Sequence, residues 1–427
     1  MKKFISGILA LCLCLPIVSA VSEPIQVLAV SDAGENTVTI DGLIYELHES
    51  ANGNNFAELI GIEDIHATSV TIPSAVNDGY RVTLPAELNW LYDYKELEEI
   101  HTENTEEDSF FSIDGVLFTA KGKTLLACPK GRKGAYTVPE GTETIWGNAF
   151  SRAEKLTSIT LPESLKEVME FAFVRCTALE EINGAVPTTN GRIIQYCSSL
   201  KSIEFKAVPD REVLSDFNLI DCYALETVTF PENMYIRGYC TVVNCPSLKS
   251  LTLNLSDELL QNDSLYIDSC ESLETLNISG KGTNLNISDC ANLNRVDVNL
   301  ESASISVTDC PELTVLNCYN SIDNKFVLLE NVDKLTVYLP TDEAYTKFGV
   351  PFVPLGAEAG AAGDVNGDYK ADILDVITIN RAVLGKERLT AEQKQAADVN
   401  GDGIIDGMDS MQIMRYIVGL IDSLDKE

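Results

Sequence analysis

The chain has 427 residues, with 65 Asp and Glu against 31 Lys and Arg, so its formal net charge is −34. This length accommodates two or more domains. The negative charge argues against nucleic acid or an anionic membrane surface as a partner, because both would repel the chain.

The first 20 residues have the layout of a secretory signal peptide. Lys2 and Lys3 precede a mostly apolar run to Val18, and small residues end the segment at Ala20. The run is too short for a comfortable bilayer span, and no later segment approaches about 18 consecutive apolar residues. We therefore expect cleavage after Ala20 and a secreted, extracellular protein without membrane insertion. An uncleaved anchor is the alternative.

A Cys-x-x-Leu repeat runs through the middle of the chain. Its seven cysteines recur at intervals of 21, 25, 23, 25, 20 and 20 residues: Cys176, Cys197, Cys222, Cys245, Cys270, Cys290 and Cys310. An apolar residue follows each Leu three positions on, and usually another two further, as in Leu273, Leu276 and Ile278. This is leucine-rich-repeat spacing. One coil cannot bury its own apolar face, so we expect a solenoid of short parallel strands stacked about 5 Å apart.

The cysteine column has a structural interpretation. Each register-matched Cys falls at the same inward position of its coil, where a small apolar thiol fits. We predict buried free thiols rather than disulfides, and no metal site, because a ladder offers no closed tetrahedral set. Cys318 replaces an inward apolar residue, whereas Cys128 and Cys240 lie outside the column and are not assigned.

The N-terminal segments carry a more particular resemblance. Asp41-Gly-Leu-Ile-Tyr45, Asp114-Gly-Val-Leu-Phe118 and the Ala-Phe pairs at 149–150 and 172–173 resemble the BspA-like leucine-rich-repeat family over residues 36 to 340. The resemblance implies a secreted or surface binding module with its ligand on the concave strand face or on inserted loops. The later coils lose the Ala-Phe pairs, so we expect them to have a more irregular convex side.

No catalytic motif stands out in this region. The three histidines, His48, His66 and His101, lie near no recognisable nucleophile, and neither G-x-S-x-G nor H-E-x-x-H occurs. Carboxylates are abundant, so a glycosidase pair stays open as an alternative. We expect the repeat domain to bind rather than to catalyse.

Two acidic segments lie 34 residues apart near the C-terminus. Each has oxygen side chains at positions 1, 3, 5, 9 and 12, which is the spacing of a calcium loop that also uses the carbonyl of position 7. Calcium takes six to eight oxygens, and without a cation the carboxylates of each loop would repel one another. We expect two Ca²⁺ ions, held by Asp364, Asn366, Asp368, Lys370 (carbonyl), Asp372 and Asp375, and by Asp398, Asn400, Asp402, Ile404 (carbonyl), Asp406 and Asp409.

The loops depart from a standard EF-hand, because position 12 is Asp in both and a small-residue segment, not a helix, precedes the first. Helices are expected at 376–384 and 410–420 after the loops, and at 390–397 between them with Thr390 as cap. The duplicated loop-helix resembles a type I dockerin over residues 363–422. The resemblance implies binding to a cohesin module of a scaffoldin, in the cellulosomes with which anaerobic bacteria degrade plant fibre.

The resemblance also implies contact residues. The family reads the cohesin with loop positions 10 and 11 and helix positions 17 and 18, which here are Ile373, Leu374, Asn380, Arg381, Gly407, Met408, Met414 and Arg415. Core packing is the alternative for the first two. Because the halves differ at positions 10, 11 and 17, we expect a single binding orientation.

Position 6 of a calcium loop is usually Gly, because the turn there needs positive φ. Gly403 follows this rule and Tyr369 does not. A non-Gly residue in that conformation costs about 1–2 kcal/mol. We therefore expect weaker calcium binding by the first loop.

The sequence thus predicts a signal peptide (1–20), a repeat domain (21–350), a linker (351–363) and a small all-α dockerin (364–422). The expected function is a secreted cellulosome subunit whose repeat domain binds a protein or polysaccharide. The alternatives are a polysaccharide hydrolase, and a structural, regulatory or adhesive subunit such as a protease inhibitor.

Overall fold

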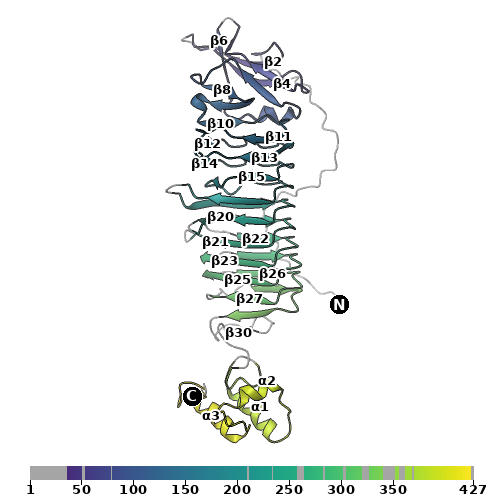
Figure 1. The fold of residues 1–427 in the computed structure, drawn as a ribbon, viewed down its shortest axis with the longest axis vertical. Helices are drawn as coiled ribbons and strands as arrows, with labels where there is room; N and C mark the ends of the chain where they lie inside the picture. Colours follow the sequence, from purple (N-terminus) through teal and green to yellow (C-terminus); the bar gives the residue numbers. More distant parts are fainter. Residues whose placement is uncertain are drawn as a thin grey trace, which may run out of the picture.

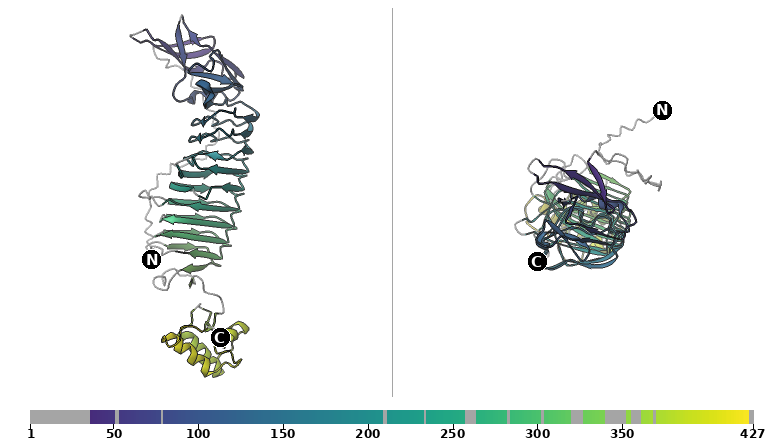
Figure 2. Two further views of the ribbon diagram at one scale, coloured as in Figure 1. Left: turned by 60° about the vertical axis from the view of Figure 1, so that its left-hand side comes forward. Right: turned by 90° about the horizontal axis from the view of Figure 1, so that it is seen from above.

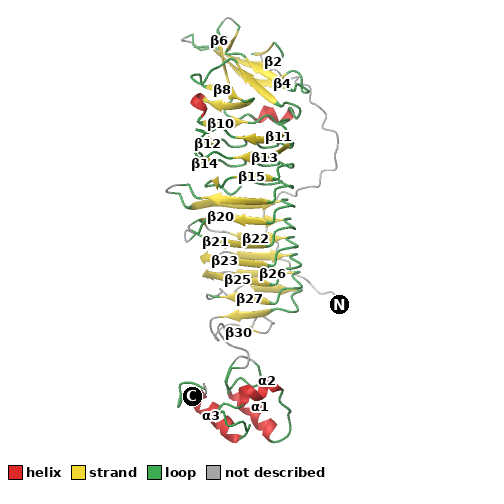
Figure 3. Ribbon diagram, viewed as in Figure 1, coloured by secondary structure: helices red, strands yellow, loops and turns green. Residues whose placement is uncertain are grey.

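The computed structural model describes residues 36–50, 53–77, 79–208, 211–232, 234–256, 264–281, 284–301, 304–319, 327–339, 352–354, 361–367 and 370–424. They form a stack of β-coils and a C-terminal module of helices (Figures 1 and 3). The expected signal peptide lies outside the described residues.

A β-rich cap begins the stack. Its five-stranded sheet has the order β1-β2-β3-β6-β5, with β1 Thr37–Ile40, β2 Leu43–His48, β3 Phe56–Ile62, β6 Tyr80–Thr83 and β5 Ala75–Val76. A parallel pair, β4 Ser69–Ile72 with β7 Glu99–Thr102, and the 3₁₀ turn η1 Asn89–Asp93 complete it. The cap has its own core around Tyr45, Leu59 and Leu91, all fully buried.

The first coils carry short strands. One sheet has the order β14-β12-β10-β9-β8, with β14 Glu167–Val168, β12 Thr144–Ile145, β10 Thr124–Ala127, β9 Val116–Thr119 and β8 Phe110–Ile113, and the 3₁₀ turn η2 Ala120–Gly122 follows β9. The other side of these coils holds β11 Gly134–Thr137, β13 Leu156–Thr160 and β15 Glu181–Asn183, then β16 Val186–Pro187, β17 Ser202–Lys206 and β19 Thr227–Thr229.

Two parallel six-stranded sheets form the later coils (Figure 2). The first contains β18 Val213–Ile220, β20 Tyr235–Val243, β22 Ser264–Asp268, β24 Asn284–Ser288, β26 Ser304–Thr308 and β28 Val327–Glu330. The second contains β21 Ser250–Asn254, β23 Thr275–Lys281, β25 Arg295–Glu301, β27 Val315–Cys318, β29 Thr336–Leu339 and β30 Phe352–Pro354.

Stacking in register builds the core. Leu276 pairs with Val296, and Val296 with Leu316, so equivalent apolar residues form continuous columns. The buried residues of the coils make one cluster that extends from Val116 to Val337. The predicted leucine-rich-repeat solenoid is confirmed, and its coils bury together what one coil could not.

A left-handed residue stands immediately before each repeat cysteine. Its φ lies between +51° and +61°, and the residues are Arg175, Tyr196, Asp221, Asn244, Ser269, Asp289 and Asp309. Four of the seven are Asp or Asn, which tolerate this conformation best among non-glycine residues. The Leu N–H then donates to the Cys carbonyl at 3.1–3.2 Å in every Cys-x-x-Leu unit, which turns the chain from one sheet into the other.

The convex side differs from expectation. It is irregular in the first coils, where β12 and β14 have two residues each, but from Val213 onward it is a regular parallel sheet. The prediction of a more irregular convex side in the later coils is wrong. The reason is the strict alternation in β24 and β26, which buries Leu285, Ile287 and Ile305 between outward Asn and Ser residues.

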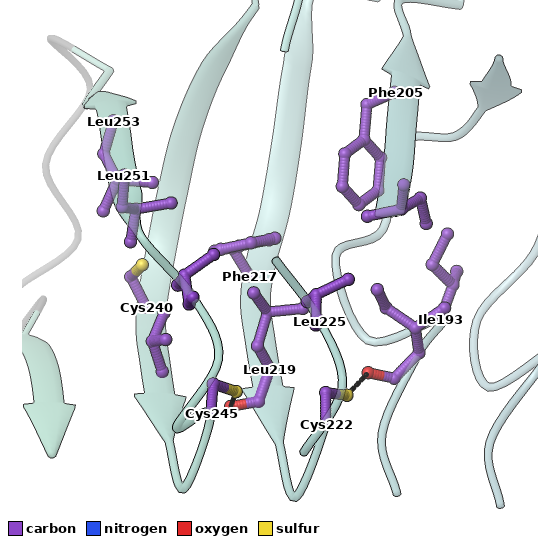
Figure 4. Packing of buried hydrophobic residues seen from close by; sticks show 14 of the residues in the cluster. Ile193, Phe205, Phe217, Leu219, Cys222, Leu225, Cys240, Cys245, Leu251 and Leu253 are labelled. Atoms are coloured by element: carbon purple, nitrogen blue, oxygen red, sulfur yellow. Dashed lines mark hydrogen bonds between the residues drawn. The ribbon is translucent and has the colours of Figure 1, made fainter. Parts of the chain in front are cut away.

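The prediction of buried free thiols in the repeat column is confirmed. All ten cysteines in the described residues are free and buried, including Cys128, Cys240 and Cys318. In the close view of the core, the Sγ atoms of Cys222 and Cys245 point at backbone carbonyls (Figure 4). The Cys176 thiol donates to the Phe150 carbonyl of the preceding coil at 3.1 Å.

These thiols should be unreactive in the folded protein, because all ten are buried and out of reach of a reagent. Burial raises the pKa of the Cys128, Cys176 and Cys318 thiols to about 12, so they stay protonated at neutral pH, and the thiolate is the nucleophile. We expect an aromatic disulfide reagent to label none of the ten at pH 8, and all ten in guanidinium. Rapid labelling of the native protein would contradict the buried column.

Three helices form the C-terminal module: α1 Ile373–Val383, α2 Ala391–Ala397 and α3 Gly407–Ile417. Its core contains Val376 and two pairs of residues that occupy equivalent places in the two halves, Val365 with Val399 and Ile379 with Ile413. Thr390 caps α2, as expected.

Several boundaries differ from the sequence expectation. α1 and α3 begin three residues earlier than expected, because Asp372 and Asp406 each make a capping box. Both ends of the range expected to be linker also take part in structure. β30 pairs with β29, and Gly363 N donates to Ala396 O at 2.8 Å.

Candidate functional site

The position-12 carboxylates are the centres of the two loops. Asp375 and Asp409 are fully buried. Asp375 Oδ1 accepts the N–H groups of Val365 (2.7 Å) and Asn366 (2.9 Å), and its Oδ2 accepts that of Asp372 at 2.8 Å. Each carboxylate therefore ties the start of its loop to the first turn of the helix that follows.

The second loop repeats this arrangement. Asp409 accepts from Asn400 N (3.4 Å) through Oδ1 and from Asp406 N (3.0 Å) through Oδ2. Gly403 has φ +80°, and its N–H donates to Asp398 Oδ2 at 3.2 Å. Positive φ at position 6 is the conformation expected for this Gly. Its first-loop counterpart, Tyr369, lies outside the described residues, as does Asp368.

The other loop residues vary in exposure. Asp364 is buried and its Oδ1 accepts Gly367 N–H at 2.9 Å, while Asn366, Lys370, Asp372, Asp398 and Asp406 are half-buried. Asn400, Asp402 and Ile404 are exposed, and Asp402 Oδ2 accepts from the Asn400 amide at 3.0 Å. No three second-loop carboxylates converge within 4.8 Å of one another.

The donor set suits a hard cation. It consists of carboxylate, amide and carbonyl oxygens, with no nitrogen or sulfur ligand at the loop positions, and calcium prefers such oxygens. The position-12 carboxylates Asp375 and Asp409 are both fully buried, where a bound cation would stabilise their negative charge. The residues therefore fit Ca²⁺.

The expected contact residues lie on the surface. All eight positions are exposed, and Ile373 (48%) and Leu374 (51%) are about half-exposed despite being apolar. Core packing of these two, the alternative weighed from sequence, is not what the structure shows. Both belong to the first turn of α1 rather than to the loop.

The structure adds residues that the sequence interpretation missed. Ile377 and Leu384 are 46% and 69% exposed, and Met411 and Val418 are 56% and 60% exposed. With Leu374 and Arg381 in α1, and with Met408 and Arg415 in α3, they recur at i, i+3, i+7 and i+10. This spacing places them on one helix face. A helical-period search for apolar residues left over after assigning the core at 376 and 379 would have found them.

The two halves differ at the contact between α1 and α3. Ser410 Oγ donates to Asn380 Oδ1 at 3.0 Å, whereas the equivalent pair in the other half is Val376 and Met414, which cannot form this bond. Arg381 Nε also lies 3.2 Å from Glu387 Oε2. The two halves of the module are thus not equivalent at this contact.

Comparison with known families assigns both parts of the chain. Residues 362–418 match the model described as Dockerin type I domain. The C-terminal module is a type I dockerin. Six copies of the BspA type leucine rich repeat region match residues 134–209 and 195–320. The dockerin therefore follows a BspA-type leucine-rich-repeat solenoid.

Solved structures of bacterial leucine-rich-repeat proteins are similar to this chain. A leucine-rich repeat protein from Eubacterium ventriosum has 18% identity and a TM-score of 0.33, covering 43% of this chain and 54% of its own. One from Bacteroides ovatus has 16% identity and a TM-score of 0.35, covering 70% and 94%. The pneumococcal vaccine antigen PcpA has 18% identity and a TM-score of 0.30, covering 61% and 56%. The chain thus spans about half the length of the first and third structures. No curated protein matches it significantly.

These assignments fix the broad class of function. Type I dockerin domains generally bind calcium and support a cohesin-binding, cellulosome-type role, and leucine-rich repeats support protein binding. Neither domain type is catalytic. Within the part of the chain that the structure describes, no helix has the length and apolar character needed to cross a membrane.

Proposed function

We propose that this protein is a secreted subunit of a cellulosome-type assembly, in which the dockerin binds a scaffoldin cohesin only when calcium is bound. The repeat domain presents a protein or polysaccharide ligand to that assembly. The observation that carries the proposal is the pair of exposed apolar faces on α1 and α3, each next to a buried position-12 carboxylate of the dockerin.

Two Ca²⁺ ions would be held by the twelve loop residues named from the sequence. Bound calcium would neutralise the carboxylates and hold each loop closed against its helix. Asp372 and Asp406 cap the two helices by accepting the Leu374 and Met408 N–H groups at 2.7 Å. The faces that carry Leu374, Ile377 and their counterparts would then be presented without further ordering, which lowers the entropic cost of binding.

Apolar burial would supply most of the docking energy. A fully buried Leu, Ile or Met side chain contributes about 1.5–3 kcal/mol. Arg381 and Arg415 would add polar anchors to an acidic cohesin rim. At position 10 the first half presents the exposed Ile373 where the second half has Gly407, so we propose one dominant orientation that uses α1.

The docking proposal is tested with paired charge substitutions. Ile373→Asp with Leu374→Asp should weaken cohesin binding by at least about 30-fold, because it puts charge in the desolvated centre of the contact. Gly407→Asp with Met408→Asp should cost less than about threefold, because that pair would lie at the rim in the dominant orientation. Surface plasmon resonance with immobilised cohesin measures both.

Gln395→Asp on the exposed side of α2 serves as the control. Equal and mild losses of cohesin affinity from the two pairs of substitutions would contradict a single orientation and would favour two alternative docking modes. Undiminished binding in excess chelator would overturn calcium-dependent docking altogether.

The two calcium loops should differ in affinity. Tyr369 stands where Gly403 adopts φ +80°, and that conformation costs a non-Gly residue about 1–2 kcal/mol. Tyr369→Gly is expected to tighten calcium binding by the first loop about tenfold, measured by titration calorimetry. A wild-type second loop that proves the weaker of the two would refute the proposal.

A further inference from the structure

The cap and the first coils enclose a pocket of about 320 Å³. One wall is the segment around η1, with Glu87, Asn89 and Tyr92. The opposite wall consists of the ends of successive coils, with Lys130 after β10, Trp146 after β12 and Glu170 after β14. The pocket is therefore assembled from residues that are up to 84 positions apart in the chain, from Ala86 to Glu170.

Lys130 is the unusual member of this lining. Only 3% of it is exposed, yet it lines the pocket. Its Nζ lies over the Tyr92 ring, 5.4 Å from the centroid, and Arg152 lies over the same ring at 4.9 Å. Among the described residues, Lys130 Nζ has neither a hydrogen-bond acceptor nor a carboxylate partner. Burial lowers the pKa of Lys130 to about 8, so the amine is still mostly protonated at neutral pH.

A buried cation without an acceptor is costly, and an anion in the pocket would offset that cost. The rim has different chemistry. Glu87 and Glu170 are exposed carboxylates, held by the amides of Asn89 (2.6 Å) and Asn190 (3.4 Å). They would repel a second negative charge but accept hydrogen bonds from hydroxyl groups. Trp146, 43% exposed, adds an aromatic surface.

We propose that this pocket binds a uronic acid, with the sugar carboxylate at Lys130, the ring hydroxyls at the Glu87 and Glu170 carboxylates and the apolar ring face on Trp146. The sugar acid meets the buried cation, the hydroxyl acceptors and the aromatic surface together. A neutral sugar offers Lys130 hydroxyl acceptors but no opposite charge, and a simple carboxylate uses neither the rim nor the ring. The proposal deepens the binding role proposed for the repeat domain and does not depend on docking to a cohesin.

The chain offers a built-in reporter. It has two tryptophans, Trp146 in the pocket and Trp90 on η1 beside it. Titration of the full-length protein with D-galacturonate or D-glucuronate should give saturable tryptophan quenching. D-galactose and D-glucose, which have the same rings without the carboxylate, should not, and neither should acetate or glycine.

Lys130→Met should weaken uronate binding at least tenfold. It should not unfold the protein, because it removes a buried unpaired charge. Lys133→Met is the matched control, since Lys133 is exposed, pairs with Glu98 and lies only three residues away. Trp146→Ala, followed by calorimetry, gives a second disruption at an exposed position and should also abolish binding.

Several outcomes would overturn the assignment. Neutral sugars that bind as tightly as the uronates would show that Lys130 does not select the ligand. Uronate binding unchanged in Lys130→Met would move the site elsewhere, and saturable binding of glycine alone would indicate an amino-acid pocket. Because cohesin binding is measured separately on the same protein, failure here leaves the docking proposal intact.

Discussion

Replacing Asp409 by Asn is expected to lower the calcium affinity of the second dockerin loop about 100-fold, equivalent to about 2.7 kcal/mol. The carboxylate is fully buried and accepts N–H groups from both Asn400 and Asp406. An amide has the same shape but offers one oxygen and no charge. Its NH₂ group would face donors, so the loop would lose an acceptor as well as a calcium ligand.

Titration calorimetry of the full-length protein measures the effect. Asp422→Asn is the matched control, because it removes the same charge from an exposed position of the same module. We also expect cohesin binding to fall, since the side chain at 409 would keep only one of the two hydrogen bonds that tie α3 to the loop. Unchanged calcium affinity in Asp409→Asn would remove position 12 from the ligand set.

Replacing Phe217 by Ala in the solenoid should destabilise the repeat domain by about 3–5 kcal/mol. Phe217 is fully buried and meets Phe205 and Phe230 edge-on, with ring centroids 6.0 and 5.1 Å away. Figure 4 shows it between Phe205 and Leu251, where consecutive coils meet. The cavity left behind cannot collapse easily, because β18 is held in parallel register with β20 and Phe217 pairs with Cys240 there.

Chemical denaturation followed by far-UV circular dichroism measures the loss of stability in Phe217→Ala. Hydrogen exchange shows which coils are destabilised. Faster exchange should be confined to the coils next to 213–243, since each coil contacts only its neighbours. Tyr239→Ala on the adjacent strand is the control, because that ring is 54% exposed. A loss below about 1 kcal/mol for Phe217→Ala would mean that the coils repack.

Local repetition explains what was predictable. The Cys-x-x-Leu period predicted the stack of coils, because every coil needs the same small residue at the same inward corner. The spacing of oxygen-bearing residues in the two loops predicted the dockerin, because oxygen ligands must recur at fixed positions around one cation. Both signals lie within about 25 residues of chain, which is the length over which a sequence pattern is easily recognised.

The predictions that proved wrong also have local reasons. The irregular convex side was expected because the later coils lose the Ala-Phe pairs. The alternating residues of β24 and β26 form regular five-residue strands without those pairs, because each strand pairs with its neighbours in the stack. The helix starts were placed three residues late because the apolar pattern begins at Val376, whereas the capping carboxylates Asp372 and Asp406 set the true first turn.

By itself, the sequence determined the architecture, the cysteine column and the class of the C-terminal module. Only the tertiary structure decided which side chains meet. In the folded protein, Ile377, Leu384 and their counterparts in the second half are exposed on the faces proposed for docking. Lys130 is buried against Tyr92 beside Trp146. The physical reason is that a repeat pattern specifies which face of each segment is buried. A pocket depends instead on how the cap closes the end of the stack, which no single repeat encodes.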